Sequence, residues 1–190
     1  MHEEAVLRIL DRAKARMEGH FRLSSGRHGA VYMQCGRVFQ YPEMAETLCK
    51  ELASRFANVE AVAGPALGAV IMAYEVSRHL GCRNLFAERE NGVMTLRRGF
   101  TVKPGERILV VEDAVTTGGS VKEVISLCRE CGADVIGVGA LIDRAGGANP
   151  FDVPFEALAR LDIPSWTEEE CPLCKEGVPC VKPGSRPGAR

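Results

Sequence analysis

One segment of the chain places two carboxylates directly before a turn that suits a phosphate. An apolar run ends at Val111 and is followed by Glu112 and Asp113, then by the Thr/Gly-rich residues 116–119 and by Ser120. Ligands of parallel α/β sheets bind at the carboxyl ends of the strands, and a helix that begins there offers unpaired N–H groups and a positive dipole end. The glycines of the turn let the backbone approach an anion without a Cβ in the way. The segment therefore predicts a phosphate-binding cradle.

The acid pair narrows the kind of ligand that this cradle would take. Two carboxylates beside the turn would repel a bare phosphate. They suit a ligand that also presents sugar hydroxyls, Mg2+ or a developing positive charge, and a ribosyl group that is losing pyrophosphate presents all three. The alternative is that Thr116 and Ser120 only cap the helix while the acids face solvent. Capping would explain Ser120 but not the whole run of acids, threonines and glycines.

Helical and strand patterns alternate along the chain, which indicates an α/β fold with a parallel sheet covered on both faces. The apolar spacing predicts helices over residues 3–17, 42–56, 69–80 and 120–131. Short apolar runs predict strands over residues 30–35, 59–63, 84–87, 107–111 and 135–142. Gly19 is expected to end the first helix. The polar stretch between residues 87 and 107 contains Asn-Gly and Pro-Gly turns, which indicates an exposed hairpin or a mobile loop.

Length and composition are those of an ordinary globular chain. The 190 residues suffice for one domain with a complete core. Hydrophobic residues make up 46% of the chain and the formal net charge is −1, a balance that does not favour a nucleic-acid-binding surface. No apolar run approaches the ~20 residues that span a bilayer, and the N-terminal segment has the pattern of an amphipathic helix, not of a signal peptide. We therefore expect a cytoplasmic protein with no nucleic-acid or membrane partner.

The run from Val110 to Ser120 resembles the signature with which type I phosphoribosyltransferases bind phosphoribosyl pyrophosphate (PRPP). A P-loop would need Gly-Lys-Ser/Thr and a dinucleotide site G-x-G-x-x-G, and this turn contains neither. The resemblance implies a single phosphoribosyltransferase domain over residues 1–190. Its mostly parallel sheet is flanked by helices, residues 1–41 contribute to a small hood, and residues 88–101 form a mobile loop. It also implies that PRPP is bound by Glu112, Asp113, Ala114, Val115, Thr116, Thr117, Gly118, Gly119 and Ser120.

Two further segments are similar to the orotate members of this family. They are residues 19–27, of sequence GHFRLSSGR, and the strand end at residues 141–144. The resemblance implies transfer of the 5-phosphoribosyl group from PRPP to orotate, which gives orotidine 5′-monophosphate and pyrophosphate in pyrimidine (UMP) biosynthesis. It implies that Thr116 and Arg144 contact orotate. By position alone, Arg144 fits a carboxylate-bearing base and a surface pair with Asp143 equally well.

The resemblance also implies how the leaving pyrophosphate is held. The turn that would contact it consists of Pro65, Ala66, Leu67 and Gly68. In the family, the mobile loop reaches across a homodimer to the neighbour's pyrophosphate. Arg89 is the candidate for that role and joins Glu112 and Asp113 as a catalytic residue, whereas Arg97 and Arg98 fit solvated charges of a hairpin as well. Mg2+ is expected to enter bound to PRPP, with no direct protein ligand.

The sequence departs from the family pattern in places, and two other functions stay open. Ser24 stands where many orotate enzymes carry a lysine, and residues 88–101 contain no lysine or histidine. One alternative is a purine or xanthine phosphoribosyltransferase, against which Arg144 and the N-terminal segment argue. The other is a PRPP-binding regulator, against which the charge balance argues. No general base is assigned, and the histidines are expected to be surface or packing residues; these are His2, His20, His28 and His79.

The tail, residues 171–190, is rich in Pro, Gly and Lys/Arg and is expected to be irregular. It carries Cys171, Cys174 and Cys180, which form C-x-x-C plus a third cysteine. A structural zinc site needs four ligands, and the spacing does not show a fourth. We expect a structural or incidental role for these cysteines, with zinc as the alternative. The other cysteines are expected to be reduced and mostly buried.

Overall fold

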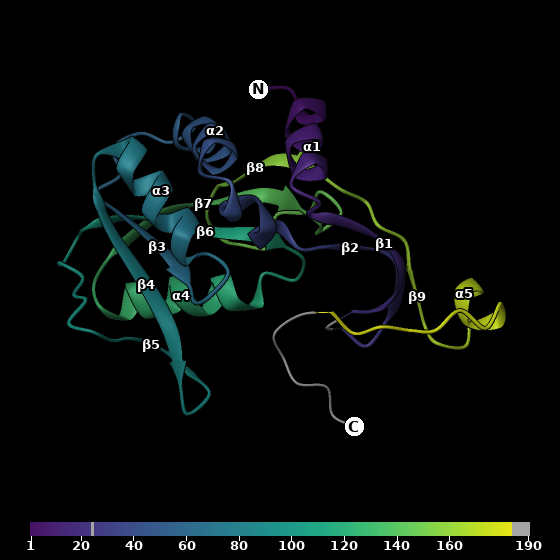
Figure 1. Ribbon diagram of the computed structural model, residues 1–190. Helices are drawn as coiled ribbons and strands as arrows, with labels where there is room; N and C mark the ends of the chain where they lie inside the picture. Colours follow the sequence, from purple (N-terminus) through teal and green to yellow (C-terminus); the bar gives the residue numbers. More distant parts are fainter. Residues whose placement is uncertain (24, 184–190) are drawn as a thin grey trace.

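A six-stranded, mostly parallel sheet forms the centre of the protein, in a computed structural model that describes residues 1–23 and 25–183 (Figure 1). Ser24 and residues 184–190 lie outside the described residues. The strands are β3 (Ala61–Pro65), β4 (Arg83–Glu90), β5 (Val93–Leu96), β6 (Arg107–Val115), β7 (Asp134–Asp143) and β8 (Phe155–Arg160), in the spatial order β5-β4-β3-β6-β7-β8. All neighbours are parallel except β4 and β5, which form an antiparallel hairpin. The predicted α/β fold is confirmed.

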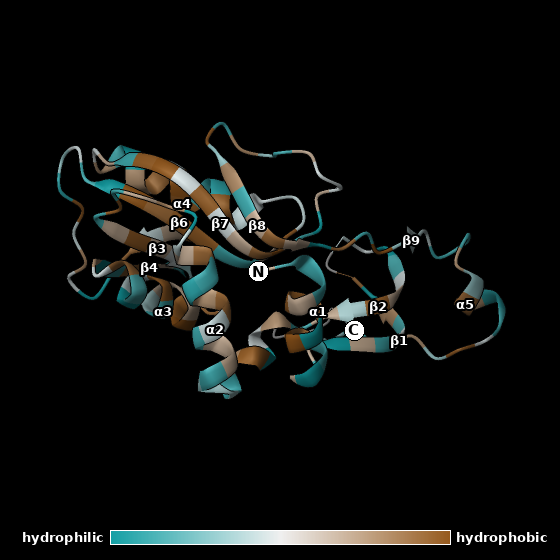
Figure 2. Cartoon of the chain, turned by 90° about the horizontal axis from the view of Figure 1, so that it is seen from above, coloured by the Kyte–Doolittle hydropathy of each residue, from teal (hydrophilic) through white to brown (hydrophobic). Residues whose placement is uncertain are grey.

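Helices cover both faces of this sheet. They are α1 (Glu3–Arg12), α2 (Pro42–Ala53), α3 (Val70–Leu80) and α4 (Gly119–Glu130). Figure 1 shows α1, α2 and α3 on one face and α4 on the other. Alternate strand residues serve the two cores: Leu109 and Val111 pack in the cluster with α1–α3, and Ile108 and Val110 in the cluster with α4. Figure 2 shows the resulting apolar character of the strands between the helices. None of the helices in the described part of the chain is long and apolar enough to cross a membrane.

The order of the strands places a crevice between β3 and β6. From β3 the chain passes through α3 to β4 on one side, and from β6 it passes through α4 to β7 on the other side. β3 and β6 themselves are parallel neighbours, paired from Ala61↔Ile108 to Ala63↔Val110. Where successive connections of a doubly wound sheet diverge in this way, the loops at the carboxyl ends of the two central strands separate and leave room for a ligand. The loops after β3 and β6 carry the predicted pyrophosphate turn and the predicted phosphate cradle.

The first helix is shorter than predicted. α1 ends at Arg12, Lys14 takes a left-handed conformation with φ of 55°, and Arg16–Arg22 forms strand β1. The prediction of a helix to Met17 was wrong because that apolar residue fits a helical spacing and a strand equally well. In the structure it pairs with Tyr32 across a hairpin, and this pairing decides its conformation.

The hairpin belongs to a small separate sheet, which we call the hood. It consists of β1, β2 (His28–Met33) and β9 (Ser165–Trp166), in the order β1-β2-β9, all antiparallel. Gly19 lies inside β1, beside an irregularity of register between Glu18 and Phe21, and does not end a helix as predicted. β8 and β9 were not predicted, since their short sequences show no continuous apolar run. A 3₁₀ helix, η1 (Cys35–Gln40), joins the hood to α2, and the last helix is the single turn α5 (Pro172–Lys175).

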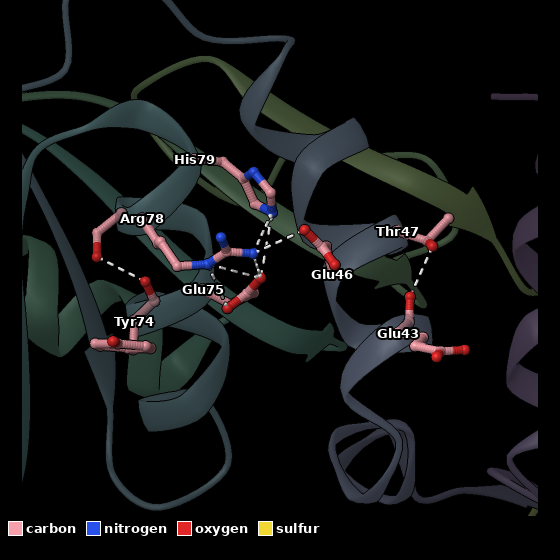
Figure 3. A network of polar contacts seen from close by, with 8 residues as sticks. Glu43, Glu46, Thr47, Tyr74, Glu75, Arg78 and His79 are labelled. Carbon is pink, nitrogen blue, oxygen red and sulfur yellow. Dashed lines mark hydrogen bonds and ion pairs between the residues drawn. The ribbon is translucent and has the colours of Figure 1, made fainter.

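A polar network on the surface joins α2 to α3 (Figure 3). Arg78 of α3 contacts Glu75 at 2.6 Å and reaches Glu46 of α2 at 3.0 Å, and His79 Nε2 lies 3.2 Å from Glu75. Hydrogen bonding to Arg78 lowers the pKa of Glu75. Exposed ion pairs of this kind are screened by water and stabilise a fold only weakly. The two helices are held mainly by their buried apolar residues.

Candidate active site

The two predicted acids sit at the crevice, inside the end of β6. The strand continues to Val115, beyond the predicted end at residue 111, because its last residues still pair with β7 up to Asp143. Glu112 and Asp113 are both half-buried. A Cβ added at Gly68, in the turn after β3, would lie 3.7 Å from both Glu112 Oε1 and Asp113 Oδ2. The fold therefore brings both carboxylates against the predicted pyrophosphate turn.

Partial burial makes these acids hold their protons more tightly than usual. Desolvation and the neighbouring charge of Asp113 raise the pKa of Glu112 to about 8, although the Asp113 N–H donates to Glu112 Oε1 at 3.2 Å and opposes the shift. Desolvation likewise raises the pKa of Asp113, against hydrogen bonds from backbone N–H groups. Two carboxyl groups in this state would gain from a ligand that brings hydroxyl donors or positive charge. Perturbed acids in a crevice are also a common mark of functional sites.

The turn after β6 has the form of the predicted cradle. Gly118 is left-handed, with φ of 71°, and a Cβ there would lie 2.6 Å from the Phe151 ring, so only glycine fits. Gly118 is itself the N-cap of α4, and no side chain in the described part of the chain caps that helix. The reading in which Thr116 and Ser120 serve only as caps is therefore wrong. Their hydroxyls and the first N–H groups of α4 stay available to an anion.

These groups line one cavity of about 510 Å3 between the sheet and the hood. Its walls are formed by Leu23, Ser25, Tyr32, Met33, Arg89, Glu112, Ala114, Val115, Thr116, Thr117, Gly118, Gly119, Ser120, Val121, Glu123 and Arg144. The structure thus brings together the predicted acid Glu112, the cradle, Arg89 and Arg144. Asp113 and the turn at residues 65–68 lie beside the lining, on the β3 side of the acid pair.

Arg144 enters the cavity with an unsatisfied side chain. Its backbone N–H donates to Val115 O at 2.7 Å, which fixes it just past the end of β7. Its Nε is buried and has no hydrogen-bond partner among the described residues. Asp143 instead accepts from the Ala145 N–H at 2.7 Å and from Arg160 Nε at 3.2 Å, so the predicted surface pair between Asp143 and Arg144 does not form. Burial lowers the pKa of Arg144. A partly desolvated guanidinium with a free donor suits an anionic ligand.

The hood forms one wall of the cavity, which the local sequence patterns did not predict. Leu23 and Ser25 come from the turn between β1 and β2, and Tyr32 and Met33 come from the end of β2. Burial, together with the charge of Asp113, raises the pKa of the Tyr32 hydroxyl, which therefore stays a hydrogen-bond donor. The turn-rich SSGR sequence pointed to a loop, but only the pairing of the hood sheet shows that this loop faces the cradle.

Arg89 lies at the rim of the cavity in its own chain. Its guanidinium pairs with Glu123 of α4 at 2.6 Å and donates to Gly92 O at 2.9 Å. Arg97 and Arg98 pair with acids of the same β4–β5 hairpin, at 3.3 Å from Glu90 and 2.9 Å from Glu88, respectively. The segment at residues 88–101 is therefore the predicted hairpin. The reach of Arg89 across a dimer stays a prediction.

The predicted pyrophosphate turn follows β3 directly. The Ala66 N–H donates to Ala87 O of β4 at 2.7 Å, and the Ala66–Leu67 peptide bond is cis. Leu67 is 85% exposed. A second hollow of about 620 Å3 lies along β8, where Arg160 and Asp143 pair with each other. Its lining contains neither the acid pair nor the cradle, so we take the cavity beside β6 as the active site.

Comparison with known proteins agrees with this geometry. The family model described as phosphoribosyl transferase domain matches residues 41–166. A protein of Caldanaerobacter subterraneus subsp. tengcongensis named orotate phosphoribosyltransferase is 55% identical over 188 residues, which are 98% of this chain and 99% of that protein. The protein of that name from Thermotoga maritima is 58% identical over 183 residues, 95% of this chain and 98% of the relative.

Solved structures give the same answer. The crystal structure of orotate phosphoribosyltransferase from Aeropyrum pernix superposes with a TM-score of 0.71 at 26% identity, over 82% of this chain and 93% of that one. The Leishmania donovani UMP synthase structure gives a TM-score of 0.72 at 26% identity, over 83% of this chain and 36% of that one. These similarities agree with the site, in which an acid pair and a glycine-containing phosphate turn lie in one crevice. The chain belongs to the phosphoribosyl transferase domain family and, within it, to the orotate phosphoribosyltransferases.

Proposed function

We propose that this chain is an enzyme that transfers the 5-phosphoribosyl group of PRPP to orotate and releases pyrophosphate, forming orotidine 5′-monophosphate for de novo pyrimidine synthesis. The observation that carries the proposal is the content of one cavity. It holds a cradle for a phosphate, an acid for a ribose and, in Arg144, a donor for an acidic base that has no partner in the described part of the chain. Adenine and guanine carry no carboxylate to satisfy that arginine, so the cavity favours orotate over a purine.

PRPP would bind with its 5′-phosphate in the turn at residues 117–120. The N–H groups that open α4 and the hydroxyls of Thr117 and Ser120 are its donors, and the helix dipole adds to the attraction. The ribose then lies over Glu112 and Asp113, whose carboxylates accept from its hydroxyls. The pyrophosphate extends toward the turn at residues 65–68, which the acid pair faces.

The acid pair also favours the transition state. As the C1′–oxygen bond to pyrophosphate breaks, positive charge develops on the ribose ring while N1 of orotate begins to bond to C1′. Negative charge on the acid pair beside the ring, which for Glu112 requires loss of its proton when the ligand binds, stabilises that state more than the ground state. N1 of orotate supplies the electron pair of the new bond and loses its proton, which the departing pyrophosphate can accept, so no side chain is assigned as a general base. Arg144 would hold the carboxylate of orotate, and Thr116 a neighbouring polar group.

Mg2+ is the cofactor that we propose, carried into the site by PRPP. The hard carboxylate oxygens of Glu112 and Asp113 are compatible with such a complex, in which they hold the ribose hydroxyls and not the ion itself. When bound, Mg2+ supplies neutralising charge for the leaving pyrophosphate. Burial and the charge of Asp113 raise the pKa of Glu112, a shift that a cationic ligand would reverse.

We also propose a homodimer with shared sites. An apolar surface supports it: Leu67, Ile71 and Tyr74 are 85%, 54% and 59% exposed and follow one another at helical spacing from the turn after β3 along α3. In such a dimer the hairpin at residues 88–101 would close over the neighbour's site, exchanging the Arg89–Glu123 pair for a pyrophosphate contact and excluding water. The eight cysteines, all without disulfide bonds, agree with a reducing cytoplasmic location.

The test is an orotate absorbance assay with PRPP and Mg2+, accompanied by adenine, guanine and xanthine as competing bases. We expect orotate to be consumed and Asp113→Asn to reduce kcat by at least ~100-fold while circular dichroism stays unchanged. Consumption of a purine in place of orotate would show the alternative transferase. PRPP binding without turnover of any base would show a regulator.

A further inference from the structure

Two histidines and two cysteines meet where the C-terminal segment crosses the hood. His20 lies in β1 and His28 begins β2. Cys171 directly precedes α5, and Cys174 lies within it. One ligand atom from each lies within 4.8 Å of every other, and three of the four residues are buried. Figures 1 and 2 show α5 at the far end of the hood, away from the helices around the main sheet. The cluster is therefore separate from the active site.

The spacing of the four atoms is that of a metal centre. His20 Nε2 lies 2.9 Å from His28 Nδ1 and 3.5 Å from Cys171 Sγ, and Cys174 Sγ lies 3.2 Å from His28 Nδ1 and 3.6 Å from His20 Nε2. Tetrahedral zinc, with bonds of about 2.0–2.1 Å to nitrogen and about 2.3 Å to sulfur, separates its ligand atoms by about 3.3–3.8 Å. The distances from His20 Nε2 to the two sulfurs fall in this range, and the two distances from His28 Nδ1 are shorter, so the four donors lie near the corners of a zinc tetrahedron.

The backbone around the cluster fixes the tautomer of His20 that metal binding would need. His20 Nδ1 lies 2.7 Å from Val178 O, and because a carbonyl can only accept, Nδ1 carries the proton. In the neutral ring Nε2 then presents a lone pair to the cluster. A hydrogen bond from the outer ring nitrogen to a carbonyl is the usual support of a zinc-bound histidine. The main chain is fixed as well, since Val181 N donates to His20 O at 2.9 Å.

The C-terminal segment has little apolar packing to hold it in place. Cys171 is the single buried residue of the stretch 167–183, and α5 is one turn of helix with no buried residue. A helical turn of this length is not stable by itself, and so small a segment has no apolar core to fold around. Metal binding can supply the missing free energy, because the ligands meet only in the folded state.

We infer that His20 Nε2, His28 Nδ1, Cys171 Sγ and Cys174 Sγ bind one structural Zn2+ that fastens the C-terminal segment to the hood. All four positions of the tetrahedron are filled by protein, so the ion has no site for water or substrate. Two expectations would change under this inference. His20 and His28 would be metal ligands and not only packing residues, and the ligands that the cysteine spacing did not show would come from the hood, 154 residues before Cys174 in the case of His20.

Two other readings explain less. A Cys171–Cys174 disulfide would leave two imidazoles facing each other without a common partner, and both thiols are free in the structure. A hydrogen bond between the two imidazoles would account for their 2.9 Å contact but not for the approach of both sulfurs. Cys180 is exposed, its Sγ lies 4.0 Å from His28 Nδ1, and it falls outside the four-atom cluster. It therefore offers a matched control.

The experiment measures metal in the full-length protein, purified without chelator from zinc-supplemented cells. We expect about one zinc per chain by mass spectrometry of the metal. Cys174→Ser and His28→Gln should lose it, whereas Cys180→Ser and the distant, exposed Cys131→Ser should keep it. Zinc-free protein at isolation that also fails to take up added Zn2+ would overturn the site, and so would loss of zinc from Cys180→Ser alone.

A second measurement covers variants that fold poorly. In the unmutated protein, a thiol-reactive mercurial should release zinc to a chromogenic chelator, and replacement by Co2+ should give the strong visible absorption of a tetrahedral site with thiolate charge-transfer bands. A six-coordinate cobalt spectrum, or release without dependence on the thiols, would contradict the assignment. Chelation should lower the Tm of the wild type and leave that of a folded Cys174→Ser protein unchanged.

Discussion

Glu112 and Asp113 are carboxyl groups that the fold keeps partly out of water before any ligand arrives. Their pKa values are raised for that reason, and Arg144, just past the end of the neighbouring strand β7, has its pKa lowered by the same cause. Each group is thus poorly solvated in the free protein and would gain a partner from the substrate. The cost of this arrangement is paid in the stability of the unliganded enzyme, and it is measurable.

The first prediction concerns Glu112 and pH. Its pKa rises from 4.5 in the unfolded chain to about 8 in the folded protein, so between these values the folded state binds more protons. Its contribution to stability is complete below about pH 4.5 and is lost as pH rises through about 8. Without ligands, the Tm of Glu112→Gln minus the Tm of the wild type should therefore increase as pH rises from about 5 to about 9. Parallel Tm curves for the two proteins would contradict the shift.

The second prediction concerns Arg144. Glutamine keeps a polar side chain but loses the charge and the fork, so Arg144→Gln should raise KM for orotate about 10- to 100-fold, as expected for one lost charged hydrogen bond. KM for PRPP should change little, because the phosphate cradle follows β6, whereas Arg144 follows β7. Arg160→Gln is the matched control, since that arginine pairs with Asp143 along β8. Equal effects on both substrates would indicate a general disturbance of the fold.

At the scale of elements, the turn between β6 and α4 contains two adjacent glycines, of which one has room for a side chain and the other has not. A methyl group at Gly118 would meet the Phe151 ring at 2.6 Å on a left-handed backbone, whereas at Gly119 the nearest atom is Thr117 Oγ1 at 3.8 Å. Gly118→Ala should therefore cost about 1–3 kcal/mol of stability and lower the Tm by roughly 2–4 °C for each kcal/mol. Gly119→Ala, at the start of a helix, should leave the Tm nearly unchanged.

These elements also show how far the sequence could be interpreted alone. The apolar run of β6, its acids and the glycines behind them are neighbours along the chain, so local patterns revealed most of the candidate site. The end of α1 was wrong because strand pairing with β2 overrode an ambiguous spacing. β9, the Arg89–Glu123 pair and the contact of His20 with Cys174 join residues far apart in sequence. Periodicity carries no information about such contacts, and only the folded chain reveals them.

At the scale of the whole molecule, the exposed apolar surface of α3 predicts an assembly. If it forms the dimer contact, Ile71→Lys should place an unpaired charge in the interface and shift the protein to monomers in analytical ultracentrifugation. Val181→Lys, at a 56% exposed position where the C-terminal segment pairs with the hood, is the matched control and should leave the mass unchanged. A wild type that sediments as a monomer at micromolar concentration would remove this prediction, while transfer to orotate would remain to be judged by its own assay.

His20 and His28 stand at the two ends of the turn that carries Leu23 and Ser25 into the active-site cavity. This part of the cavity wall is therefore held between two of the four side chains that would bind the ion. Trimming the protein before Cys171, far from any substrate, should loosen that wall and weaken affinity for the base. The order of a cavity wall would thus depend on side chains that lie 151 residues further along the chain.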